Sequence, residues 1–147
     1  MLILKYSLIQ TRSMWICPKC ERQFKTANQS HTCSETTLDD LFAKSSDELI
    51  LAFDRILSEV ISWEPCSVGA AKKAVVFTSQ KAWLILRPMT KVLDLKFYYN
   101  EPLEGDIFHK IAPWGNKYAH HLRIQSEVEI TDEILDLLRK GHRYSLE

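Results

Sequence analysis

The spacing of apolar residues changes twice along this chain of 147 residues, and these changes constrain its fold more than any other feature. From Leu49 to Ile61 apolar residues recur every three or four positions, which is the period of an amphipathic helix, and a second such stripe runs from Ile134 to Leu138. Between the stripes, apolar and polar residues alternate as in half-buried strands over 73–78, 82–87, 92–99 and 118–125. This order predicts an α+β fold, a two-layer sandwich of a four-stranded antiparallel sheet with the helices on one face.

Polar residues suited to helix N-termini precede the first long stripe. Thr36 or Thr37 can cap a short acidic helix over 38–44, because a threonine hydroxyl accepts a hydrogen bond from a free backbone N–H group. Ser45 and Glu48 have the spacing of a capping box. We therefore expect the first long helix to begin at Ser45.

The C-terminal third shows equally local signals. Residues 100–117 include two prolines and two glycines, which predicts a long loop before the last strand. Thr131 is suited to cap a final helix over 132–140, and Gly141 is suited to end it.

Three of the four cysteines crowd into a short segment near the N-terminus together with one histidine. Cys17 and Cys20 have the spacing that lets a tight turn aim two thiolates at one ion, and His31 with Cys33 supplies a second pair. Three thiolates and one imidazole are a ligand set that tetrahedral structural zinc prefers, and they leave no open coordination position for catalysis. A redox dithiol formed by Cys17 and Cys20 is the alternative.

The net charge differs from one segment of the chain to the next. The formal net charge is zero, from 19 basic and 19 acidic residues, which excludes a binder that attracts polyanions with its whole surface. The segments 1–34 and 65–147 are nevertheless basic, whereas 35–64 is acidic. We expect an N-terminal arm over 1–14, a zinc-binding knuckle over 15–34 and the α+β domain over 35–147.

No apolar stretch reaches the roughly 18 residues that span a bilayer, and no signal-peptide cleavage site follows the apolar start of the chain. Clustered cysteines with metal-ligand spacing are typical of proteins in a reducing compartment. Both observations predict a cytoplasmic protein.

The predicted strands place polar side chains on one face of the sheet. Alternation puts Lys96 and Tyr98 on one side of their strand, and His121 and Arg123 on one side of another. With Arg87 they would form a cationic, aromatic patch suited to phosphate, nucleic acid or an acidic protein partner, although an ordinary solvated face is the alternative. His120 points the other way and is expected to be a buried, hydrogen-bonded histidine.

Catalytic motifs are scarce. The chain has no glycine-rich phosphate loop and no nucleophile in a strand-to-helix elbow. Asp94 and Lys96 resemble the end of a nuclease motif, but no acidic residue lies between Glu64 and Asp94 to complete a metal site. An enzyme is therefore the less favoured hypothesis, and no catalytic residue is assigned.

Three segments carry a resemblance to a known family: Lys-Ala-Val-Val-Phe at 73–77, Leu-Asp-Leu-Lys-Phe at 93–97 and Tyr-Ala-His-His-Leu-Arg-Ile at 118–124. Together with the closing amphipathic helix, they make the region from about Leu38 to Ser145 resemble the bacterial domain-of-unknown-function family 5655 (DUF5655). The family has no established catalytic residues, so the resemblance implies no active site.

The cysteine-rich segment resembles a leader found on small bacterial proteins, including some with domains similar to the YdhG-like group. That group is compared with frataxin, so the resemblance implies iron handling as an alternative role. The candidate iron-binding side chains would be the acidic residues Asp39, Asp40, Asp47, Glu48 and Asp54.

The sequence thus favours a non-enzymatic binding module with one structural Zn²⁺, acting on nucleic acid or a protein partner. Intracellular iron or metal handling is the alternative, and an enzyme with an unrecognised site is a further one.

Overall fold

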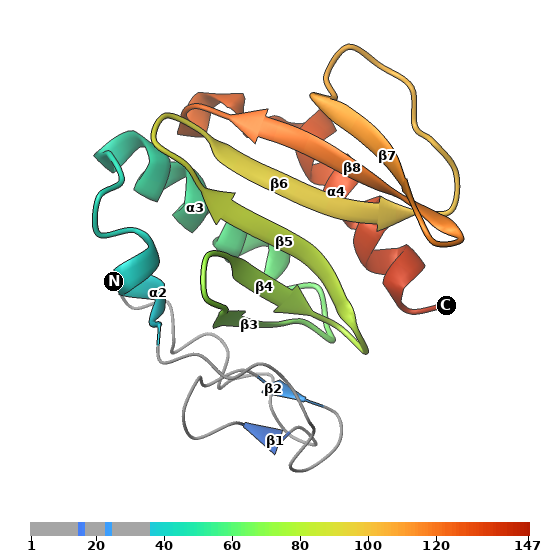
Figure 1. Ribbon diagram of the computed structural model, residues 1–147, viewed down its shortest axis with the longest axis horizontal. Helices are drawn as coiled ribbons and strands as arrows, with labels where there is room; N and C mark the ends of the chain where they lie inside the picture. Colours follow the sequence, from blue (N-terminus) through green and yellow to red (C-terminus); the bar gives the residue numbers. More distant parts are fainter. Residues whose placement is uncertain (1–14, 17–22, 25–35) are drawn as a thin grey trace.

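The computed structural model describes residues 15–16, 23–24 and 36–147, and its main body is an antiparallel sheet with helices on one face (Figure 1). The sheet has six strands in the order β3-β4-β5-β6-β8-β7. Their bounds are β3 Ser67–Ala70, β4 Val75–Thr78, β5 Ala82–Pro88, β6 Leu93–Tyr99, β7 Lys110–Trp114 and β8 Lys117–Ile124. The helices are α2 Leu38–Leu41, α3 Asp47–Val60, the 3₁₀ helix η1 Glu127–Glu129 and α4 Asp132–Ser145. The α+β class and the one-sided helices are as predicted, whereas the sheet has six strands, not four.

The two additional strands, β3 and β7, lie at the edges of the sheet, where a strand can form without a clear alternation of apolar and polar residues. Strand β3 consists of small residues, and β7 contains Pro113 inside the segment predicted to be a loop. An edge strand tolerates proline because one side of its backbone needs no ladder hydrogen bonds. Gly115, with φ at +64°, begins the two-residue turn that pairs Trp114 with Lys117. The predicted loop over 100–117 is therefore wrong for its second half.

The helix starts follow the capping rules, with one correction. Thr37 caps α2: its Oγ1 accepts from the N–H of Asp40, and its own N–H donates to Asp40 Oδ2, both at 3.1 Å. Helix α3 is capped by Ser46 instead of Ser45, since Ser46 Oγ accepts from the N–H of Leu49 at 3.3 Å. The two serines are adjacent and chemically identical, so only the backbone conformation distinguishes them.

Helix α4 continues through Gly141, which was expected to end it. A Cβ atom at this position would lie 2.9 Å from Phe97 Cδ2 and 3.1 Å from Phe97 Cβ. Gly141 therefore serves close packing of α4 on β6, where any larger residue would collide with a fully buried ring.

The core lies between the sheet and the two long helices. On the helix-covered face, the side chains of the central strands are almost completely buried: Val75, Phe77, Leu84, Leu86, Leu93, Leu95, Phe97, Leu122 and Ile124. Phe53 and Ile56 of α3 and Ile134 and Leu138 of α4 complete this layer. No helix in the described part of the chain is long and apolar enough to cross a membrane.

Candidate functional site on the open face of the sheet

The face of the sheet opposite α3 and α4 carries every residue of the predicted cationic patch, and we call it the open face. The strand register pairs Lys96 with His121, and Asp94 with both Arg87 and Arg123. Tyr98 lies two residues beyond Lys96 on the same side of β6. Figure 1 looks onto this face, with α3 and α4 behind the strands and no described helix in front of them.

A buried carboxylate organises the middle of the open face. Asp94 is only 5% exposed, and its Oδ2 accepts a hydrogen bond from His121 Nδ1 at 3.1 Å. Its other oxygen lies 3.5 Å from Nε of Arg123. Because a carboxylate only accepts, Nδ1 of His121 carries a proton and Nε2 remains as the second polar atom of the ring. The predicted patch did not include Asp94, since the partners of this carboxylate depend on the strand register.

A depression of about 200 Å³ opens beside this cluster. Its lining combines side chains of β5, β6 and β8 with the segment that joins β3 to β4: Lys73, Ala74, Ile85, Arg87, Asp94, Lys96 and His121. Among the described residues, no carboxylate forms an ion pair with Lys73, Arg87 or Lys96. The depression is therefore rich in unneutralised positive charge.

Two aromatic side chains lie next to the depression. The rings of Tyr98 and Trp114 are 6.3 Å apart, and Trp114 is 56% exposed. Lys96 Nζ lies 5.2 Å from the Trp114 ring, and Lys117 Nζ lies 4.3 Å from the Tyr98 ring. The predicted patch did not include Trp114, which fell in the segment predicted to be a loop. We call Tyr98 and Trp114 the aromatic platform.

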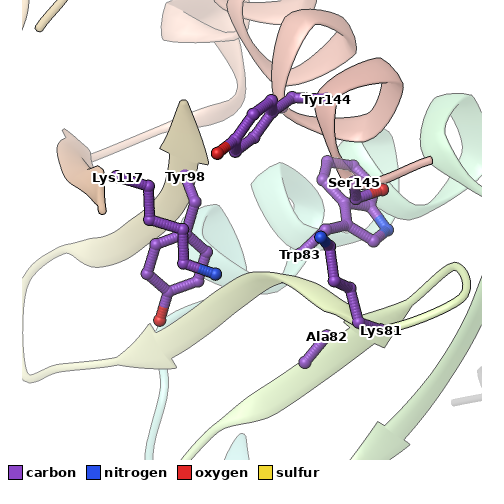
Figure 2. Close-up of a pocket in the computed structure, with 8 residues that line it drawn as sticks. Lys81, Ala82, Trp83, Tyr98, Lys117, Tyr144 and Ser145 are labelled. Carbon is purple, nitrogen blue, oxygen red and sulfur yellow. The ribbon is translucent and has the colours of Figure 1, made fainter. Parts of the chain in front are cut away.

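The far end of the platform adjoins a small cavity of about 10 Å³, room for roughly one water molecule (Figure 2). Two lysines line this cavity: Lys117 lies beside Tyr98, and Lys81 lies near Trp83 and Ser145. Partial burial, followed by the charge of Lys81, lowers the pKa of Lys117. Positive charge thus extends from the depression to this end of the sheet.

His120, the neighbour of His121, lies on the opposite face and is completely buried, as predicted. Its Nε2 accepts from the N–H of Leu103 at 2.9 Å, and its Nδ1 donates to the carbonyl oxygen of Tyr118 at 3.1 Å. Burial lowers the pKa of His120, so the neutral ring is favoured. Both nitrogens serve the fold, which leaves His120 without a role on the open face.

The buried thiol of Cys66 has a pKa raised to about 12 by burial, which suits the predicted role of a small core residue. The other three cysteines belong to the predicted metal site. Its ligands Cys17, Cys20, His31 and Cys33 lie outside the described residues. The structure describes the short strands on either side of the first pair, β1 Trp15–Ile16 and β2 Gln23–Phe24, which are antiparallel.

The acidic residues considered for iron sit at helix starts or on α3. Asp39 and Asp40 are in the first turn of α2, and Asp47 and Glu48 in that of α3, where acidic groups stabilise the helix. Desolvation raises the pKa of Asp54. Within the part of the chain that the structure describes, no three His, Cys, Asp or Glu side chains gather as a metal site would require.

The comparison with protein families gives one match, to the family described as "Domain of unknown function (DUF5655)", over residues 38–145. The matched region contains both long helices, the whole six-stranded sheet and the open face. No curated protein and no solved structure matches the chain. The chain therefore belongs to the DUF5655 family.

Proposed function

We propose that this protein is a non-enzymatic binding module whose open face takes up single-stranded nucleic acid. The observation that carries the proposal is the aromatic platform of Tyr98 and Trp114, lying beside lysines on a sheet face that no described helix covers. Single-strand binders combine these two elements: bases stack on aromatic rings, and cations track the phosphates.

The charge of the open face supports the proposal although the chain as a whole is neutral. Asp94 is the one acidic residue in strands β3–β8, and it is already paired with His121 and Arg123. The basic residues of this face are more numerous: Lys73, Arg87, Lys96, Lys110, Lys117 and Arg123. The excess is local, so a polyanion would meet it only on this side of the domain.

A single strand fits the platform better than a duplex does. Stacked, paired bases hide their faces, whereas an unpaired base can lie on Trp114, whose ring is more than half exposed. The lysines over the rings occupy this place in the free protein at 4.3–5.7 Å from the ring centroids. On binding they would turn toward the phosphates, and the base would replace them on the ring.

The test is fluorescence anisotropy with labelled DNA and RNA strands of about 12 nucleotides, single-stranded and as duplexes, at low salt. We expect single strands to bind more tightly than duplexes, with an affinity that falls as salt rises. Trp114→Ala should weaken binding about 5- to 150-fold, because one base–ring stack is worth about 1–3 kcal/mol. Leu51→Ala, at another exposed apolar residue on α3, is the matched control.

No binding of any strand at low salt would overturn the proposal. Binding of an acidic peptide such as polyglutamate, with none of nucleic acid, would favour the acidic protein partner instead. A duplex bound as tightly as its single strands would exclude a stacking role for Trp114.

We also propose that the N-terminal segment holds one structural zinc ion through Cys17, Cys20, His31 and Cys33. The soft donor set supports this, because three thiolates and an imidazole suit tetrahedral zinc. The β1–β2 pairing supports it too, since it sets Ile16 opposite Gln23, the residues that flank the segment with the first two cysteines.

Metal analysis of the purified protein tests the zinc proposal. We expect about one zinc ion per chain, lost in Cys17→Ser and retained in Cys66→Ser, whose cysteine lies in the core of the sheet domain. Full zinc content in Cys17→Ser would contradict the assigned ligands.

A further inference from the structure

The depression on the open face gathers positive charge from several segments of the chain. Arg87, Lys96 and Lys73 contribute cations from three separate segments, and none pairs with a described carboxylate. Arg123 adds a fourth cation at its border through its contact with Asp94. The one acidic group is Asp94, which is 5% exposed and faces His121 and Arg123.

Asp94 also sets the orientation of the imidazole. By accepting from Nδ1 at 3.1 Å, it holds the His121 ring at the wall of the depression and assigns the proton to that nitrogen. Nε2 has no hydrogen-bond partner among the described residues. A phosphate can therefore hydrogen-bond this nitrogen in two ways. One of its oxygens can accept from a protonated Nε2, or a phosphate hydroxyl can donate to an unprotonated Nε2.

The positive charge of the depression exceeds the negative charge of an internal phosphodiester, because each such linkage carries only one negative charge. A terminal phosphate, a phosphomonoester, carries nearly two at neutral pH and offers three acceptor oxygens. Arg87 suits it in particular, since a guanidinium can bind two phosphate oxygens at once. The volume of about 200 Å³ leaves room for a compact group of this kind.

The neighbouring platform indicates what carries this phosphate. Lys96 and Tyr98 are two residues apart on one side of β6, or roughly 7 Å along the strand, which is the scale of one nucleotide. We propose that the depression binds the terminal phosphate of a nucleic acid strand, with the end nucleotide stacked on Tyr98 and Trp114. The inference rests on the proposed function and narrows its ligand to phosphorylated strand ends.

The experiment compares one short single strand in three forms: 5′-phosphorylated, 3′-phosphorylated and without a terminal phosphate. We expect one phosphorylated form to bind at least about tenfold more tightly than the unmodified strand, equivalent to about 1.4 kcal/mol. Arg87→Gln should abolish this difference, because it should weaken the phosphorylated strand about tenfold more than the unmodified strand, which loses only one of several open-face cations. Arg143→Gln, which removes an exposed cation from α4 on the helix side, is the control and should change neither.

Equal affinities for the three forms would overturn the inference, even if every form binds and the proposed function stands. A phosphate preference that persists in Arg87→Gln would place the terminal phosphate elsewhere and equally overturn it. A titration with inorganic phosphate separates the two proposals. If the protein binds inorganic phosphate but no strand, and Arg87→Gln loses the phosphate, the depression is an anion site whose ligand is not nucleic acid.

Discussion

The two faces of this sheet use the same strands for opposite purposes, and His120 and His121 show the difference most directly. These neighbours on β8 point to opposite sides. His120 is fully buried with both ring nitrogens hydrogen-bonded inside the protein. His121 is 21% exposed, is held through Nδ1 by Asp94, and lines a depression open to solvent. Alternation alone thus separates a histidine that stabilises the fold from one available to a ligand.

The largest expected effect contrasts Phe97 with Tyr98, which are adjacent on β6. Phe97 is fully buried, and its ring stacks on His120 at 5.1 Å. Phe97→Ala should lower the free energy of unfolding by about 3–5 kcal/mol, because it leaves a cavity in the core. Tyr98→Ala should cost much less stability and weaken strand binding instead. Urea unfolding and anisotropy of both variants measure the contrast, and similar stability losses in the two would contradict it.

We expect Asp94 to contribute more to stability than Arg87, its cross-strand neighbour on the open face. Asp94→Ala removes the partner of His121 Nδ1 and of Arg123 Nε, so we expect a loss of about 1–3 kcal/mol in unfolding free energy. Arg87→Ala removes a charge from the same face without a paired carboxylate in the described region, and it should change stability by less than about 0.5 kcal/mol. Equal losses in the two variants, measured by urea unfolding, would show that Asp94 has no special structural role.

Gly141 tests how closely the covered face is packed. Gly141→Ala places a Cβ 2.9 Å from the buried ring of Phe97, and the overpacking cost of about 1–3 kcal/mol exceeds the gain in helix propensity of about 1 kcal/mol. We expect a net loss of about 1 kcal/mol. Lys140→Ala, at the preceding exposed position of the same helix, should be neutral. A stabilised Gly141→Ala variant would mean that α4 can move away from β6 without penalty.

Much of the covered face could be predicted, because its signals are local. The stripe from Leu49 to Ile61 and the alternation around Phe97 follow directly from the periods of helix and strand. The edge strands β3 and β7 were missed, since small residues and Pro113 give no alternating pattern there. Gly141 was misread because a glycine needed for close packing has the same sequence signal as one that ends a helix.

The open face could be predicted by residue but not by arrangement. Alternation placed Lys96 with Tyr98, and His121 with Arg123, on one side of their own strands. That β6 pairs with β8 at Lys96–His121, which brings Asp94 against His121 and Arg123, depends on a register between segments some 25 residues apart. Trp114 joined the platform only through the hairpin β7–β8. The predicted zinc ligands remain a prediction, because they lie outside the described residues.

The smallest expected effect concerns pH and again separates the two faces. Burial lowers the pKa of His120 and of His142, whose ring packs against Trp83 and whose Nε2 donates to the carbonyl oxygen of Pro65 at 3.0 Å. As pH falls, these two histidines therefore bind protons in the unfolded chain at a higher pH than in the folded chain. The stability from these two residues is complete above the unfolded pKa of about 6.5 and declines as pH falls below it, toward the lowered folded pKa values.

Urea unfolding at about pH 7.5 and about pH 5.5 measures this decline, in a range above the ordinary pKa values of carboxyl groups. His142→Gln should lose less stability between the two conditions than the parent protein, because glutamine can donate to Pro65 without gaining a charge. Trp114→Ala, which removes an exposed side chain of the open face and no titratable group, is the control. We expect it to lose as much stability between the two conditions as the parent. A decline in His142→Gln as large as that of the parent would show that His142 on the buried face does not resist protonation.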